Sequence, residues 1–156
     1  MYFEKAGKQN TEKTLEVVRD AIKKYDVKHV VIASCKGYTA KLFKDANLGV
    51  NLVCVTHVTG FEKPGQQEMS ENVRKELTDA GVKVLTTTHV LSGAERGISR
   101  KFGGAYPVEI IAQTLRMLGQ GTKVCVETAV MALDAGLIPY GEDIIAVGGT
   151  SEGADT

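Results

Sequence analysis

The sequence contains no tryptophan, no CxxC pair and no long apolar run, and these absences exclude several classes of protein. Its cysteines, Cys35, Cys54 and Cys125, are odd in number and widely spaced, which favours free thiols over a disulfide framework or a CxxC-type zinc site. No stretch approaches the roughly 20 apolar residues of a membrane span, and no signal-peptide pattern opens the chain. We therefore expect a cytoplasmic protein with no membrane partner.

The sequence also lacks a net charge, because 19 Lys and Arg residues balance 19 Asp and Glu residues. A balanced chain has no strongly basic surface of the kind that binds nucleic acid, so we expect no nucleic-acid partner. There is no Walker loop, no GxGxxG and no Ser-His-Asp order. The residues by themselves therefore assign no catalysed reaction and no catalytic residue.

What the sequence does contain is an alternation of helical and strand-like segments along a single domain, residues 1–156. Short apolar runs typical of strands buried on both faces lie at 29–34, 52–56, 82–86 and 144–147. Helices are predicted over 11–25, 38–46, 69–80 and 107–118, and a buried helix capped by Thr122 over 122–135. This alternation predicts an α/β protein with neighbouring parallel strands.

Hydrophobic periodicity also predicts which helical residues face the core. It places Tyr25 on the inward face of the first helix, and Ile111 and Leu118 on the inward face of the helix that begins at Pro107. Residues 87–105, by contrast, carry four glycines and three basic residues without a clear period. A long segment without regular structure is usually functional or mobile, so we predict that residues 88–105 form an irregular, mobile flap over the binding site.

Small hydrogen-bonding residues gather where the predicted strands end. Ligands of open parallel sheets bind outside the carboxyl ends of the strands. Residues 34–39 join the first strand to a helix start, where free N–H groups and the helix dipole favour an anion. Gly37 would let the backbone approach that anion closely, whereas helix capping by Ser34 and Thr39 is the competing explanation.

Other polar residues near the predicted crevice admit two interpretations each. The glycine-rich residues 148–155 form either a second binding loop or a flexible C-terminal tail. His57 and His89 have no carboxylate or thiol at a telling sequence spacing, so we predict hydrogen-bonded structural histidines and no metal site. Cys35 lies at a helix start that can activate a thiol, but no partner base is evident, which favours a spectator thiol.

Two resemblances to known families add to this interpretation. The pattern Ser-x-x-Gly-x-Thr at 34–39 resembles the phosphate loop of flavodoxin-type FMN proteins. A broader resemblance is to the C-terminal domain of pyruvate kinase, because VVIASCKGYTAKL (30–42) and VNLVCVT (50–56) are similar to its strand, turn, helix and second strand. THVTGF, FGGAYPVEI, VMALDAGLIP and GGTSEGADT extend the likeness, over nearly the whole chain, to small stand-alone proteins of that fold.

The second resemblance implies a three-layer α/β/α fold with a mainly parallel sheet of strand order 3-2-1-4 and an antiparallel fifth edge strand. It also implies that FMN can occupy the crevice, where pyruvate kinase holds a phosphate of its sugar-bisphosphate effector. We expect no pyruvate kinase activity, since the sequence does not contain that enzyme's catalytic barrel.

Our hypothesis from the sequence is an FMN-binding protein, with a redox role left open. The alternative is a regulatory or sensing module that binds a phosphorylated metabolite without catalysis. Either function makes the partner a small phosphorylated ligand, and a homo-oligomer is a further possible state. The residues expected at the ligand are Ser34, Cys35, Lys36, Gly37, Tyr38, Thr39, Thr56, His57, Gly60, Phe61, Thr88, Gly148, Gly149, Thr150, Gly153, Ala154 and Asp155.

Overall fold

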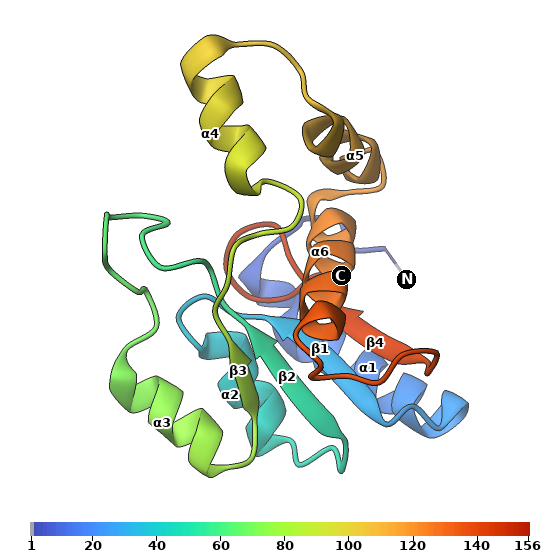
Figure 1. Ribbon diagram of the computed structural model, residues 1–156. Helices are drawn as coiled ribbons and strands as arrows, with labels where there is room; N and C mark the ends of the chain where they lie inside the picture. The colour runs from blue at the N-terminus through green and yellow to red at the C-terminus, as the bar shows by residue number, and fades with distance from the viewer. Residues whose placement is uncertain (1) are drawn as a thin grey trace.

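Four parallel strands form the centre of the molecule (Figure 1). They are β1 (His29–Ala33), β2 (Asn51–Val55), β3 (Lys83–Leu85) and β4 (Ile144–Val147). Their spatial order is β3-β2-β1-β4, and Val31 of β1 lies opposite Val53 of β2 and Ala146 of β4. The structure, a computed structural model, describes residues 2–156. The predicted α/β fold class, parallel pairing and strand order 3-2-1-4 are confirmed.

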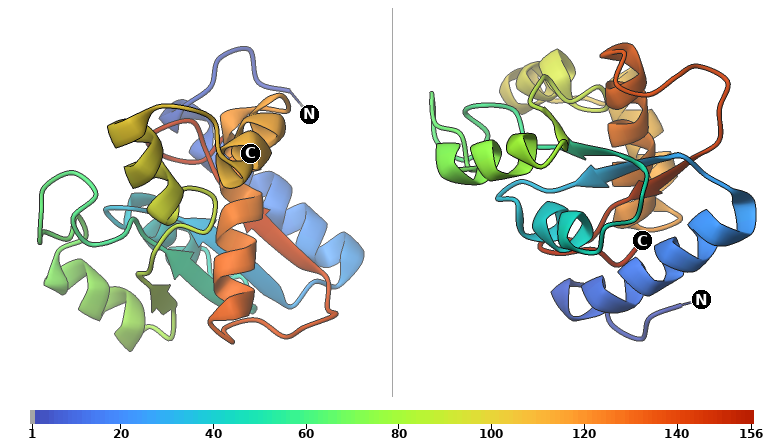
Figure 2. Two further views of the ribbon diagram at one scale, coloured as in Figure 1. Left: turned by 45° about the horizontal axis from the view of Figure 1, so that its top comes forward. Right: turned by 90° about the horizontal axis from the view of Figure 1, so that it is seen from below.

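Helices cover both faces of the sheet, which explains why the central strands are apolar over Val30–Ile32 and Leu52–Val55. A single 3-10 turn, Lys8–Asn10, leads into α1 (Thr11–Tyr25), which packs with α2 (Tyr38–Asp45) and α3 (Glu71–Asp79) on one face. The other face is covered by α6 (Gln120–Asp134), and Figure 2 shows α1 and α2 on the side of the sheet opposite α6. Alternate residues of β1 point to opposite faces of the sheet. Val30 and Ile32 pack in the core beneath α1, α2 and α3, and Val31 packs in the core beneath α6.

Two helices, α4 (Gly93–Phe102) and α5 (Pro107–Arg116), stand together away from the sheet (Figure 1). The prediction of an irregular segment over 87–105 is therefore wrong for most of its length. Its helix buries no residue fully, and its apolar residues Ala94, Ile98 and Phe102 are few and lie among glycines and charged residues. Polar contacts hold it to α5 instead: the Glu95 carboxylate accepts from the Val108 N–H at 2.8 Å, and the Ser99 hydroxyl donates to Glu109 at 2.5 Å.

Three residues predicted to face the core are exposed. Ile111 and Leu118 are 50% and 76% exposed because α5 packs beside α4 and α6 rather than on the sheet. Tyr25 is 62% exposed, since it is the last residue of α1 and lies beyond the edge of the core. Periodicity identifies one apolar face of a helix, but it does not say whether another element covers that face.

The chain ends beside the sheet edge, at β4. The described residues form no fifth strand, but Gly148 and Thr156 exchange two backbone hydrogen bonds, of 2.9 and 3.1 Å, the pattern of an antiparallel pair. The helix α6 begins at Gln120 with Gly119 as its cap, so Thr122 is an internal residue and not the predicted cap. Within residues 2–156, no helix combines the length and the apolar character that crossing a bilayer requires.

Candidate functional site

A cleft of about 1330 Å³ opens at the carboxyl ends of β1 and β2. Its floor includes Ala33 and Val55, the last residues of these two strands. Its walls come from the β1–α2 turn, the β2–α3 loop, α4, α5, α6 and the loop that follows β4. This is the end of the sheet at which parallel α/β proteins bind ligands.

Most of the residues expected at the ligand do surround this one cleft. The residues that line it are Ser34, Cys35, Lys36, Tyr38, Thr39, Thr56, His57, Phe61, Gly149 and Gly153. The expected residues outside the lining are Gly37, Gly60, Thr88, Gly148, Thr150, Ala154 and Asp155. Both glycine-rich strand exits therefore border the same cavity, as their sequence positions predict. Several of their residues nevertheless lie outside its lining.

The β1–α2 turn presents hydrogen-bond donors to the cleft. Ser34 acts as a helix cap, because its hydroxyl accepts from the Ala40 N–H at 3.3 Å. Thr39 is only 2% exposed and lines the cleft, and none of the described residues forms a hydrogen bond with its hydroxyl. The N–H groups of Tyr38 and Thr39, in the first turn of α2, likewise have no partner in residues 2–156. The turn thus caps α2 through Ser34 and leaves Thr39 directed at the cavity.

Gly37 has a different neighbour from the one predicted. It adopts φ +95°, and a Cβ at this position would overlap Cγ1 of Val73 on α3. The close approach that glycine permits here is therefore between the β1–α2 turn and α3, and not between the backbone and a ligand. Gly37 contributes to the site by holding the turn in place.

The loop after β4 is packed against α1, which contradicts a free C-terminal tail. The Ala154 N–H donates to the Thr11 hydroxyl at 3.0 Å, and the Ala154 carbonyl accepts from Thr14 at 3.2 Å. The Asp155 carboxylate accepts from the N–H groups of Gly7 and Thr150, at 2.8 and 3.2 Å. Ala154 and Asp155 therefore hold this loop in position, while Gly149 and Gly153 line the cleft.

Three rings form a cluster on the β2 side of the cleft. The His57 and Phe61 rings stack with centroids 3.8 Å apart, and the His89 ring lies 5.4 and 5.5 Å from them. His89 accepts a hydrogen bond on Nε2 from the Val58 N–H at 3.2 Å, and burial lowers its pKa, so His89 is a neutral acceptor. The Arg96 guanidinium of α4 lies 5.6 Å from the centre of the Phe61 ring.

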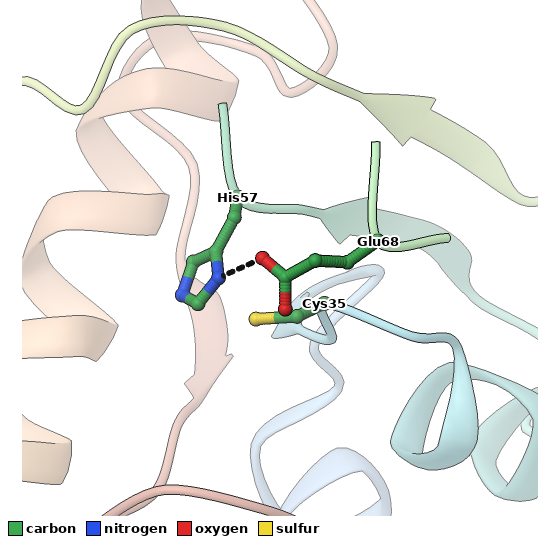
Figure 3. Close-up of side chains that lie close together, drawn as sticks. All are labelled: Cys35, His57 and Glu68. Carbon is green, nitrogen blue, oxygen red and sulfur yellow. Dashed lines mark hydrogen bonds and ion pairs between the residues drawn. The ribbon is translucent and has the colours of Figure 1, made fainter. Parts of the chain in front are cut away.

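Beside these rings, a thiol, an imidazole and a carboxylate converge (Figure 3). Nδ1 of His57 and Oε2 of Glu68 lie 2.6 Å apart, and one potential metal-binding atom from each of Cys35, His57 and Glu68 lies within 4.8 Å of the other two. Sequence spacing does not associate His57 with a carboxylate or a thiol, because Cys35 is 22 residues before it and Glu68 is 11 residues after it. Glu68 was missed altogether.

The Cys35 thiol is protonated and therefore unreactive as a nucleophile. Burial, together with the negative charge of Glu68, raises its pKa to about 12. Its thiolate fraction at pH 8 is then about a thousandfold below that of an ordinary cysteine, and the greater nucleophilicity of a basic thiolate recovers part of the difference. We expect iodoacetamide to alkylate Cys35 about 100-fold more slowly than the same residue in urea-unfolded protein. Peptide mass mapping measures both rates, and equal rates would contradict the assignment of a protonated, buried thiol.

A buried ion pair on α6 was not predicted from the sequence. Lys123 and Glu127 line the cleft, pair with each other, and have side chains that are each 7% exposed. The second carboxylate oxygen of Glu127 accepts from the Leu91 N–H at 2.9 Å, which fixes the segment that leads into α4. The sequence does carry a signal for this pair, since two opposite charges four residues apart interrupt a segment predicted to be a buried helix.

Two comparisons relate this chain to known proteins. A sequence model of the family described as "Pyruvate kinase, alpha/beta domain" matches residues 12–156. The structure is similar to that of a pyruvate kinase from Cryptosporidium parvum, with 16% sequence identity and a TM-score of 0.47 over 88% of this chain. That match covers 20% of the enzyme, so this chain spans about a fifth of its length. Since the family match includes every strand of the sheet and both glycine-rich strand exits, the chain belongs to the family of pyruvate kinase alpha/beta domains.

Proposed function

We propose that this protein binds FMN in the cleft at the carboxyl ends of β1 and β2, with the phosphate on the β1–α2 turn. The observation that carries the proposal is the pairing of two features in one cavity. Free N–H groups and the Thr39 hydroxyl lie at the start of α2, and the stacked rings of His57 and Phe61 lie on the β2 side. A flavin phosphate needs both, a site for a dianion and a surface for a flat aromatic ring.

The size and charge of the cleft support this proposal. Its volume of about 1330 Å³ exceeds the roughly 300–1,000 Å³ of most ligand pockets, so it admits a mononucleotide. Lys8, Lys36 and Arg96 reach it from three separate segments and supply positive charge for a phosphate. Lys8 also lies 4.2 Å from the centre of the Tyr38 ring, at the start of α2.

The test is a comparison of FMN affinity in the parent protein, Thr39→Ala and Thr39→Ser. A hydrogen bond to a charged group contributes about 1.5–3 kcal/mol, so Thr39→Ala should weaken FMN binding roughly ten- to a hundredfold. Thr39→Ser keeps the hydroxyl and should bind FMN with nearly the parent affinity. Quenching of flavin fluorescence during titration measures all three dissociation constants.

Riboflavin is the matched ligand control, because it has the same ring system without the phosphate. It should bind weakly and equally to all three proteins if Thr39 acts on the phosphate. An equal loss of FMN and riboflavin affinity in Thr39→Ala would place the defect in the ring site, and unchanged FMN affinity would place the phosphate elsewhere. A purified protein that stays colourless, binds no FMN and is stabilised by sugar phosphates would instead support the regulatory alternative.

A further inference from the structure

The arrangement of Cys35, His57 and Glu68 has a chemistry that flavin binding does not use. The three donor atoms differ in type, a thiol sulfur, an imidazole nitrogen and a carboxylate oxygen, and they meet within 4.8 Å of one another. They come from three separate places in the chain, the β1–α2 turn, the exit of β2 and the segment before α3. All three residues line the cleft, so the point where they converge is reached from solvent.

The spacing of the donors is close to that of a tetrahedral metal site. Zinc bonds of about 2.0–2.3 Å place neighbouring ligand atoms roughly 3.3–3.8 Å apart. Here Nδ1 of His57 and Oε2 of Glu68 lie 2.6 Å apart across a hydrogen bond, and Sγ of Cys35 lies within 4.8 Å of a ring nitrogen of His57 and of a carboxylate oxygen of Glu68. Replacement of the hydrogen bond by an ion therefore needs the first pair to open and the thiol to approach, each by about an ångström or less.

The charges at this place also call for a cation. The Glu68 side chain is 8% exposed, and its one ion-pair partner within residues 2–156 is His57, which is charged only when protonated. Buried carboxylates are normally paired or coordinate a metal. A divalent cation held by a thiolate, a carboxylate and a neutral imidazole would form an electrically neutral cluster.

The same three residue types could instead suggest a nucleophilic cysteine, but the geometry does not support one. In such a site the two nitrogens of the histidine ring serve different partners, one the thiol and the other the carboxylate. In Figure 3 the Nδ1 edge of His57 faces the Glu68 carboxylate, and Nε2 points away from both Glu68 and Cys35. A thiol with a pKa of about 12 is also far from the activated state that such catalysis needs.

We propose that Cys35, His57 and Glu68 bind a Zn²⁺ ion through Sγ, Nδ1 and a carboxylate oxygen. Thiolate, imidazole and carboxylate are the ligands that zinc takes in proteins. Three protein ligands leave the fourth position of a tetrahedral ion for water or for a ligand atom in the cleft, as in zinc sites that bind substrates. On binding, the thiol proton leaves to solvent, and His57 coordinates as a neutral imidazole with its one ring proton on Nε2.

The experiment uses flavin-free, chelator-treated full-length protein, so that its result is independent of FMN binding. Co²⁺ serves as the spectroscopic probe for Zn²⁺, because a cobalt–thiolate bond produces a charge-transfer band in the near ultraviolet. We expect one Co²⁺ per chain with this band, and its displacement by one equivalent of Zn²⁺. The absence of a thiolate band in the parent protein would overturn the proposal.

Variants assign the ligands. Cys35→Ser should abolish the charge-transfer band, and Cys35→Ser, His57→Gln and Glu68→Gln should each weaken Zn²⁺ binding by at least about 100-fold, more than the loss of an outer-shell partner costs. Cys125→Ser is the matched control, because Cys125 is also partly buried, has a pKa raised to about 11, and lies outside the cluster. Glu68→Gln preserves a hydrogen-bond acceptor for His57, so it tests the carboxylate with little risk to folding.

Circular dichroism and thermal unfolding of each metal-free variant establish that the comparisons are made on folded protein. The proposal is overturned if Cys35→Ser keeps the band, if Cys125→Ser loses it, or if Glu68→Gln binds Zn²⁺ with the parent affinity. It is supported if the three cluster variants lose affinity together while Cys125→Ser retains it.

Discussion

Gly37→Ala should lower the free energy of unfolding by about 2–5 kcal/mol. Two effects add at this position. The backbone has φ +95°, where an alanine is strained by about 1–2 kcal/mol, and the new methyl group would overlap Val73 Cγ1 on α3. Val73 is β-branched and stiff, so its accommodation should cost a further 1–3 kcal/mol or so. Equilibrium unfolding in urea, followed by circular dichroism, measures the loss.

Two variants separate the strain from the overlap. Gly49→Ala introduces the same methyl group at φ +70° with no atom within 4 Å, so it should cost only about 1 kcal/mol. Val73→Ala removes the overlapping Cγ1, so Gly37→Ala should be less damaging in that background than in the parent. Equal costs for Gly37→Ala and Gly49→Ala would mean that α3 moves aside freely and that the overlap carries no energy.

Lys123→Met should destabilise the protein by about 3–5 kcal/mol. The substitution keeps a long apolar side chain but removes the only cation paired with Glu127 in the described residues. Both side chains are 7% exposed, so the remaining carboxylate would be left with the Leu91 N–H and without a counter-charge. The same urea unfolding experiment measures the effect.

An exposed pair of the same spacing provides the control. Lys75 and Asp79 on α3 also lie four residues apart, with side chains 75% and 62% exposed, so Lys75→Met should cost about 1 kcal/mol or less. Restoring neutrality should recover most of the loss at the buried site, so the double variant Lys123→Met, Glu127→Gln should be more stable than Lys123→Met. A cost for Lys123→Met no larger than that for Lys75→Met would show that water in the cleft solvates Glu127 well.

The buried Lys123–Glu127 pair also connects stability to the shape of the cleft. Glu127 holds the Leu91 N–H just before α4, and α4 in turn carries Arg96 to the Phe61 ring. This chain of contacts positions one wall of the cavity relative to α6. Lys123→Met should for this reason also change FMN affinity, measured on the folded fraction of the protein.

Sequence patterns predict the sheet well because each strand has to satisfy a local condition. The runs at 29–34, 52–56 and 144–147 are apolar on both faces apart from residues at their ends, and the edge run at 82–86 differs only in Lys83; continuous apolar runs of this kind are typical of strands in a covered parallel sheet. Since the exits of parallel strands meet at one edge, the polar residues that follow β1 and β4 are placed at one crevice by the same reasoning. The strand order came from the family resemblance, because periodicity does not specify which strands are neighbours.

The sequence by itself therefore determined the α/β class, the four strands and the end of the sheet where the cleft lies. Only the tertiary structure decided what meets there: Cys35 comes from the β1–α2 turn, His57 and Glu68 come from opposite ends of the β2–α3 loop, and loop conformation depends on contacts that have no sequence period. It likewise decided that Gly37 faces Val73, and that Ile111 on α5 and Leu118 just after it remain exposed. The physical reason is the same in each case. Burial patterns are local and recur along an element, whereas contacts between elements depend on how the whole chain packs.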